Sequence, residues 1–439
     1  LYTKTILRIN ERGSKKLKKK VISMLLTACA VSAMVAGGST SLVMADDAET
    51  ITMMGWYDED DMNPILDKVN EQMDGKYVME YTYVANSDFN NVLSTQLAAG
   101  EGPDIIMDGT NFPAEIKAGN VEDISDADFV SEFNEAGMAL CTADGKTYGI
   151  PSYGWFSGIW CNTAILEECG VEVPKTFDEF VAACKTINEK GYTAYGFGIA
   201  DDTTATSSLL GYLENSYYHN NDEVNPDGID FDTKFAMGEV TMDGHINDSV
   251  NKWCTLVDEG LIASESLGIS CQEMLNSFKN GEVAFLHGGP WQYNELKESG
   301  ISFAMLPQLS ESGENVYVLG GPAACFGINV NTENHDGAEA ALNALASVDV
   351  QQAFADANVG GTSYRSGIVA QMPEEYDYVA DIINSGNIAF PSDRWSVNMP
   401  SQSLFDEFTA QIQGVISGDI TGDELIQAID AKADSIRYE

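Results

Sequence analysis

Aromatic and polar side chains gather in this sequence where predicted strands end. Three groups are Trp56-Tyr57-Asp58, Asp108 with Thr110 and Asn111, and Tyr153 with Trp155 and Phe156. A sugar has an apolar C–H face that stacks on a flat ring, and hydroxyls that pair with acids and amides. These residue types therefore suit the binding of a hydroxylated ligand. The alternatives are that the rings pack in a core and that the acids and amides cap loops.

Four later residues are further candidates. Trp291 follows Gly288-Gly289-Pro290, and Gly321 is the second residue of a glycine pair that would let the backbone approach a ligand. Arg365 stands out because basic residues are scarce, and its guanidinium could bind hydroxyls or a carboxylate. Trp395 is the last candidate. An ordinary turn at Gly321 and a surface ion pair at Arg365 are the alternatives.

Strands and helices alternate in the first part of the chain. Residues 51–54, 77–84 and 104–107 have strand patterns, whereas 62–73 and 87–100 have helical spacing of apolar residues. This alternation predicts a parallel or mixed sheet covered by helices. Thr176 with Glu179, and Thr421 with Glu424, predict capping boxes that begin two later helices. Residues 301–306 predict a further strand.

Composition excludes several classes of partner. The formal net charge is −45, with 68 acidic and 23 basic residues, so phosphate-rich nucleic acid and anionic membranes would be repelled. The chain is 44% hydrophobic, which predicts a folded protein. Its length exceeds one ordinary core, and no linker divides it. We therefore expect two domains between which the chain passes more than once.

The N-terminal residues have the pattern of a secretory signal. Five lysines between 15 and 20 precede an uncharged stretch, 21–45, that ends in Val43-Met44-Ala45. We expect export with cleavage after Ala45, and a translation start nearer Leu17; an uncleaved anchor is the alternative. Leu26-Thr27-Ala28-Cys29 resembles a lipobox, so lipidation of Cys29 is a second alternative.

Metal and cofactor sites are not expected. Four histidines without an H-E-x-x-H pattern argue against zinc. The seven later cysteines contain no C-x-x-C pair, and we expect buried thiols, with one disulfide left open. Glu223 to Lys234 begins like a calcium loop but ends in lysine, and the residues before Lys146-Thr147 form no P-loop.

Six segments, in order, resemble the extracellular solute-binding family that includes the maltose-binding protein. They are FNNVLSTQLAAGEGPDIIM (89–107), GKTYGIPSYGWFSGIWCN (145–162), GVEVPKTFDEF (170–180), FKNGEVAFLHGGPW (278–291), residues 320–331 with the helix from Asp336, and GVISGDITGDEL (414–425). Together they cover roughly residues 49–439.

The resemblance implies an α/β, two-lobed, periplasmic-binding-protein-like fold with a ligand cleft between lobes and multiple hinge crossings. We expect residues 1–45 to be the signal segment, 46–158 and 301–354 to form lobe 1, and 159–300 and 355–439 to form lobe 2. The implied function is the substrate-binding component of an ABC importer, which closes on a sugar and docks on permease subunits. We expect a monomer without a cofactor, a metal or enzymatic activity.

The resemblance also implies site residues. Trp291 lies where the family places a stacking tryptophan, Trp56 to Asp58 where it places first-lobe contacts, and Trp395 where some relatives have a cleft aromatic. The alternative functions are a binding protein for a peptide, polyamine or organic acid, a secreted glycoside hydrolase, and a receptor or adhesin without transport. The abundance of acids keeps the hydrolase open, although there is no G-x-S-x-G motif.

Overall fold

The computed structural model describes residues 48–438 except 202, 219–224 and 226–229. The predicted signal segment, its exit at Ala45 and the lipobox Cys29 lie outside these residues. Within the part of the chain that is described, no helix combines the length and the apolar character needed to cross a membrane.

The first sheet has five strands in the order β2-β1-β3-β12-β6. Its strands are β1 (Glu49–Gly55), β2 (Tyr77–Tyr83), β3 (Ile105–Asp108), β6 (Ile150–Pro151) and β12 (Cys325–Ile328). β1 is parallel to β2 and β3, whereas β12 runs antiparallel to β3. The strand–helix alternation of the sequence therefore builds a mixed sheet, as expected.

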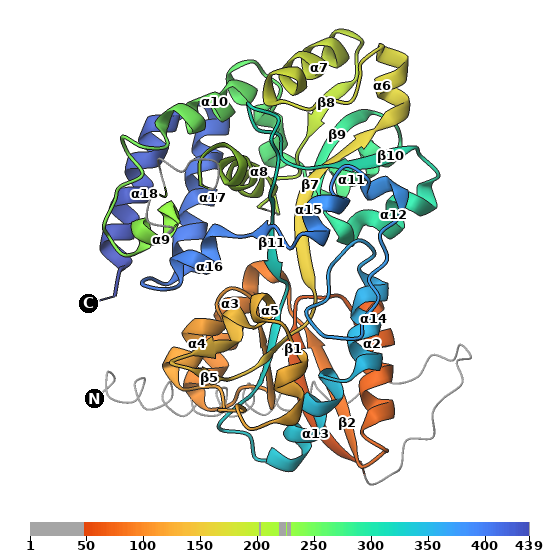
Figure 1. Ribbon diagram of the computed structural model, residues 1–439, viewed down its shortest axis with the longest axis vertical. Helices are drawn as coiled ribbons and strands as arrows, with labels where there is room; N and C mark the ends of the chain where they lie inside the picture. Colours follow the sequence, from red (N-terminus) through yellow and green to blue (C-terminus); the bar gives the residue numbers. More distant parts are fainter. Residues whose placement is uncertain (1–47, 202, 219–224, 226–229, 439) are drawn as a thin grey trace, which may run out of the picture. The chain divides into compact units, whose positions relative to one another are not determined.

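Helices α2 (Glu59–Gln72) and α3 (Asn86–Ala99) connect the first three strands. α3 ends where Gly100 adopts a left-handed φ of 72°, a conformation that glycine reaches without steric cost. Later in the chain, α13 (His335–Leu345) and α14 (Val348–Ala357) pack on the same core. Figure 1 shows α14 beside α2, and Gln72 of α2 donates a hydrogen bond to Asp349 of α14.

The second sheet has six strands built around β7 (Gly154–Asn162). β7 is antiparallel to its partners β9, β10 and β11. The other strands are β8 (Thr193–Gly196), β9 (Val283–Gly288), β10 (Phe303–Leu306), β11 (Val318–Pro322) and β13 (Ile388–Ala389). Seven of the nine residues from Gly154 to Asn162 are apolar or glycine, which suits a strand covered on both faces.

Helices surround the second sheet. The longest of them are α7 (Phe177–Glu189), α8 (Thr204–Leu213), α10 (Asn247–Asp258), α17 (Ser401–Ser417) and α18 (Gly422–Ile436). The predicted capping box of α18 is confirmed, because Thr421 and Glu424 cap each other's backbone N–H. At α7, Thr176 accepts from the N–H of Glu179, but the Glu179 carboxylate accepts from the N–H of Lys175 instead.

The chain passes between the two sheets in three segments. They are the step from β6 to β7, the step from β11 to β12, and residues 358–364 after α14. Figure 1 shows β7 and β11 side by side, and Gly154 of β7 exchanges backbone hydrogen bonds of 2.7 and 2.9 Å with Thr362. The segments that connect the two sheets are therefore hydrogen-bonded to one another.

The expected boundaries between the lobes differ from the bounds of the elements. The boundary at 158 falls inside β7 (Gly154–Asn162), and the one at 354 falls inside α14 (Val348–Ala357), which packs on the first core. The expected return to lobe 1 at residue 301 is also too early, because β10 (Phe303–Leu306) pairs with β7 in the second sheet. The chain re-enters the first sheet only at β12, after Pro322. A run of four buried apolar residues fits either sheet, so its partner is decided by tertiary packing.

Candidate functional site

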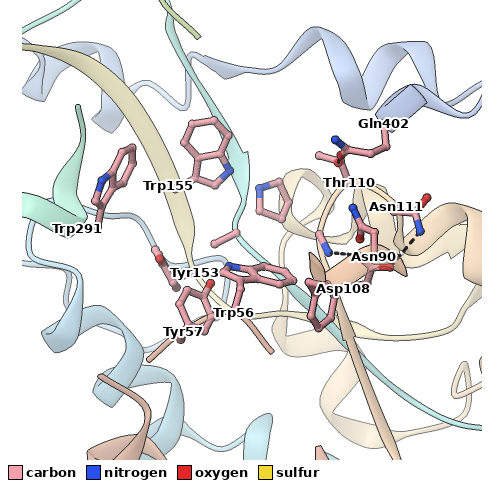
Figure 2. Close-up of a pocket in the computed structure, with 14 residues that line it drawn as sticks. Trp56, Tyr57, Asn90, Asp108, Thr110, Asn111, Tyr153, Trp155, Trp291 and Gln402 are labelled. Carbon is pink, nitrogen blue, oxygen red and sulfur yellow. Dashed lines mark hydrogen bonds between the residues drawn. The ribbon is translucent and has the colours of Figure 1, made fainter. Parts of the chain in front are cut away.

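A cavity of about 400 Å³ lies where turns of the first sheet meet residues of the second. Figure 2 shows its aromatic side, with Trp155 and Trp291, and its polar side, with Asp108 and Asn111. The full lining is Trp56, Tyr57, Phe89, Asn90, Asp108, Gly109, Thr110, Asn111, Tyr153, Trp155, Trp291, Pro322, Ala323 and Gln402. The cavity therefore combines rings with amide, hydroxyl and carboxylate groups.

The turn after β1 supplies two rings to this cavity. Trp56 is half-buried and meets Phe89 of α3 edge-to-face, with ring centroids 4.9 Å apart and planes at 80°. Tyr57 lies 5.6 Å from Trp56 and 6.2 Å from Tyr153, between ring centroids. These contacts fix the rings by packing, which preorganises the wall of the cavity.

Two tryptophans lie next to each other on the other side, with tilted rings. The ring centroids of Trp155 and Trp291 are 6.3 Å apart with planes at 60°. Trp155 is fixed by an edge-to-face contact with Phe390, at 5.4 Å and 79°. Trp291 is 45% exposed, so its ring is presented to solvent instead of to a core. A Cβ on Gly289 would lie 2.1 Å from the Trp291 indole, so only glycine at position 289 leaves room for this ring.

Asp108 ends β3 and is buried at the polar side of the cavity. Its Oδ1 accepts the N–H of Gly109 at 2.7 Å, and its Oδ2 accepts the Asn111 amide at 3.2 Å. Burial raises the pKa of Asp108 to about 7, although these two hydrogen bonds oppose the shift. The carboxyl group can therefore gain or lose a proton near neutral pH.

A hydrogen bond joins the two parts of the protein at the rim. Thr110, in the turn after β3, donates from Oγ1 to Oε1 of Gln402 at 3.2 Å. Gln402 belongs to α17, which packs in the core of the second sheet, and its amide also donates to Asp406 at 2.8 Å. The rim is therefore already bridged in this conformation.

Eight of the residues predicted from sequence line this cavity together. They are Trp56, Tyr57, Asp108, Thr110, Asn111, Tyr153, Trp155 and Trp291. Their roles toward a ligand remain predictions. The residues come from separate turns and strands, and the fold brings them to one cavity.

The other four candidates lie elsewhere, each for a local reason. Asp58 is exposed and begins α2, where its Oδ1 accepts the N–H of Asp61 at 3.0 Å. Arg365 donates to the carbonyls of Ala346 and Ser366, at 2.6 and 2.9 Å, and thereby satisfies the end of α13. Its guanidinium therefore donates to backbone carbonyls.

Trp395 is fully buried and stacks on Phe408, with centroids 5.3 Å apart and planes at 3°. The interpretation of Trp395 as a cleft aromatic is therefore corrected: its ring is part of the second core. Gly321 pairs with Trp155 in the ladder between β11 and β7, and it lines a different cavity.

Sequence reasoning missed Phe89, Asn90, Pro322, Ala323 and Gln402. Phe89 belongs to the apolar spacing of the predicted helix 87–100, and Asn90 beside it was not singled out. Gln402 is a polar residue on a long helix with no neighbouring aromatic cluster, so only the approach of α17 to the turn after β3 identifies it.

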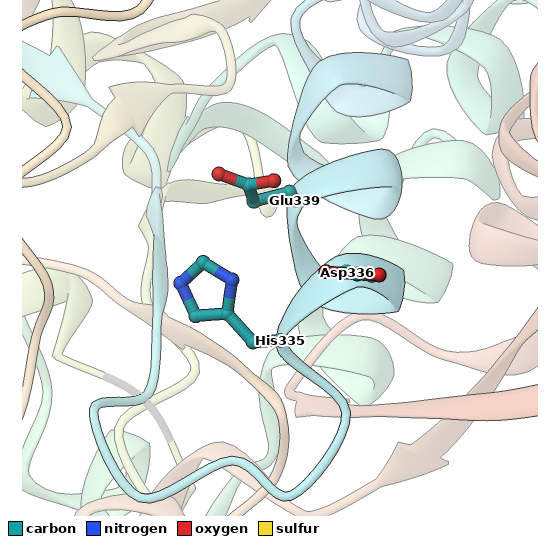
Figure 3. Close-up of side chains that lie close together, drawn as sticks. All are labelled: His335, Asp336 and Glu339. Atoms are coloured by element: carbon teal, nitrogen blue, oxygen red, sulfur yellow. The ribbon is translucent and has the colours of Figure 1, made fainter.

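Among the described residues, one group could approach metal-binding geometry. It consists of His335, Asp336 and Glu339 at the start of α13, all exposed. In Figure 3, His335 and Glu339 project from the same side of the helix. His335 Nε2 already meets the Glu122 carboxylate at 2.8 Å, and this hydrogen bond raises the pKa of His335. His335 therefore belongs to a surface ion pair with Glu122.

Comparisons with known proteins agree with this architecture. The sequence profile of the bacterial extracellular solute-binding protein family matches residues 71–352. A multiple sugar-binding protein of Streptococcus mutans is 22% identical over 290 residues, which are 65% of this chain and 68% of that protein.

Solved structures show the same fold. A family 1 extracellular solute-binding protein from Bifidobacterium longum subsp. infantis has a TM-score of 0.67 at 24% identity, covering 88% of this chain and 99% of its own. A sugar transporter protein from Bacillus licheniformis, solved in complex with stachyose, has a TM-score of 0.68 at 18% identity, covering 87% and 98%. With the profile spanning well over half of its length, the chain belongs to the bacterial extracellular solute-binding protein family.

Proposed function

We propose that this protein is the extracytoplasmic substrate-binding component of an ABC importer and that it captures a sugar or short oligosaccharide in the cavity of Figure 2. The observation that carries the proposal is the neighbouring pair Trp155 and Trp291 in the same cavity as the Asp108 carboxylate. Rings of this kind stack on sugar C–H faces, and an ionised carboxylate accepts strong hydrogen bonds from hydroxyls.

Two further facts support a carbohydrate ligand. The Streptococcus mutans relative is named as a sugar-binding protein, and the Bacillus licheniformis structure contains stachyose. The cavity also presents amides at Asn90, Asn111 and Gln402, which can both donate to and accept from hydroxyl groups.

The mode of action follows from the crossings. Each sheet with its helices forms one lobe, and rotation about the three crossing segments brings the lobes together on the ligand. The protein acts as a monomer outside the cytoplasm, delivers the ligand to membrane permease subunits, and carries out no catalysis itself. A separate ATPase supplies the energy.

A thermal-shift screen tests the proposal. The chain without residues 1–45 is mixed with mono- and oligosaccharides, and separately with amino acids, peptides, polyamines and organic acids. A ligand at a hundred times its Kd adds about 2.7 kcal/mol of stability, which raises Tm by several degrees. A shift with one sugar family and no turnover supports the proposal.

The other outcomes are equally informative. A shift only with a non-sugar solute would retain the importer and overturn the carbohydrate assignment. Cleavage of an oligosaccharide during incubation would overturn the binding-protein proposal in favour of a hydrolase.

A further inference from the structure

A second cavity of about 400 Å³ adjoins the crossing segments, and it shares only Pro322 with the first. Its walls include the crossing segments 320–322 and 361–364, Asn134 from the first-sheet side, and Ile388 and Asp393 from the second-sheet side. Trp155, whose ring lines the first cavity, pairs in the ladder with Gly321, which lines the second. The two cavities therefore lie against the same pair of strands.

Asp393 lacks the partners that a buried carboxylate requires. Its Oδ1 is buried and has no hydrogen-bond partner among the described residues. The neighbouring Arg394 directs its guanidinium away, to Asp232 and Glu214 at 2.6 Å each. An unpaired carboxylate in such a place costs free energy, and burial raises the pKa of Asp393 to about 7. Such a group is satisfied by a ligand that brings a donor.

The shape of the strand lets this carboxylate reach the cavity. A Cβ on Gly321 would lie 3.0 Å from Asp393 Oδ2, so a larger residue would press on the carboxylate. Across the cavity, the hydroxyls of Thr362 and Tyr364 lie against Gly154, where a Cβ would meet them at 2.0 and 2.8 Å. Glycine at both strand positions thus keeps polar groups close to the backbone.

The remaining lining defines the class of ligand. No lysine or arginine lines the cavity, so Asp393 is its one charged side chain among the described residues. Apolar side chains form part of the wall, namely Ile368, Met372, Ile383 and Ile388. A cation with an apolar body complements this combination, because the charge pairs with the carboxylate while the body covers the aliphatic wall.

We propose that this cavity is a second ligand site, which takes a small organic ammonium ion with Asp393 as its counter-ion. The ammonium group donates a charge-assisted hydrogen bond to the Asp393 carboxylate, which lines the cavity. The volume admits a body of several carbon atoms, since a single water occupies only about 30 Å³ of liquid. The site is separate from the sugar site proposed above and does not depend on it.

Isothermal titration of the whole chain with butylammonium chloride tests this site, with 1-butanol as the neutral isostere. We expect butylammonium to bind at one site and 1-butanol to bind at least tenfold more weakly. Asp393→Asn should lower the affinity for butylammonium at least tenfold. The exposed acid on the neighbouring segment, changed in Asp377→Asn, should leave it unchanged.

Asp108→Asn distinguishes the two cavities, because Asp108 is the buried carboxyl group of the first cavity. Butylammonium affinity should survive this change. Ile388→Trp provides a second variant that fills the cavity without altering Asp393, and it should also abolish binding while circular dichroism shows a folded protein. Absence of binding by the unaltered chain, equal affinity for 1-butanol, or loss of binding in Asp108→Asn in place of Asp393→Asn would each overturn the proposal.

Discussion

The ring centroids of Trp155 and Trp291 lie 6.3 Å apart, although the two residues come from a crossing strand and from a distant turn. Trp155 is held by Phe390, whereas Trp291 is 45% exposed and has no comparable core packing. One ring is therefore fixed and the other is free to adjust to a ligand. This difference predicts different consequences when each ring is removed.

Trp291→Ala should weaken sugar binding at least tenfold and leave the Tm of the ligand-free protein nearly unchanged. The ring is largely solvent-facing, so its removal opens no cavity in a core. Isothermal titration with the sugar identified by the screen, together with thermal unfolding, measures both effects. Unchanged affinity would remove Trp291 from the site.

Trp395→Ala should give the opposite pattern. The indole is fully buried and stacks on Phe408 in the second core, so truncation should cost about 3–5 kcal/mol of unfolding free energy. Any variant that remains folded should bind the sugar with nearly normal affinity. Urea unfolding gives the first quantity. A large specific loss of affinity with normal stability would return Trp395 to the cleft.

Asp108→Asn should change the pH dependence of stability. Burial raises the pKa of Asp108 from 3.8 to about 7, so the folded protein retains a proton that the unfolded chain has released. The stabilising contribution of this group is fully present below about pH 4 and is lost as pH rises through about 7. The asparagine variant, which cannot ionise, should therefore gain stability relative to the unaltered chain between pH 5 and pH 8, by roughly 1–3 kcal/mol.

Urea unfolding at pH 5, 6, 7 and 8 measures this difference. Asp67→Asn changes an exposed acid of α2 and serves as the control. Its free energy of unfolding, plotted against pH, should run parallel to that of the unaltered chain. Parallel curves for Asp108→Asn as well would show that the Asp108 carboxyl group titrates normally.

Arg394→Leu should destabilise the second lobe strongly. Arg394 binds Asp232 and Glu214, whose side chains are fully buried, so its removal leaves two acids without their cation. The expected cost is about 3–5 kcal/mol in urea unfolding. Lys68→Ala breaks the exposed Lys68–Glu71 pair and should have no measurable effect. Similarly small losses of unfolding free energy in Arg394→Leu and Lys68→Ala would mean that the buried acids are protonated in the folded state.

Local patterns in the sequence determined the elements and much of the first cavity wall. Residues at strand ends, such as Trp56 and Asp108, could be located because the ends of strands in α/β sheets face the ligand crevice. Thr421 with Glu424 could be identified because a capping box depends only on residues three apart. The resemblance to the family, carried by six ordered segments, then supplied the two-lobed fold.

Only the tertiary structure decided which late aromatic residue faces the cavity. Trp291 and Trp395 both come shortly after a proline in the sequence, but one is 45% exposed and the other is fully buried. Gln402 and the partner of β10 were likewise decided by packing between distant segments. Burial and contact across a hundred or more residues depend on how whole lobes pack, and short patterns carry no information about that packing.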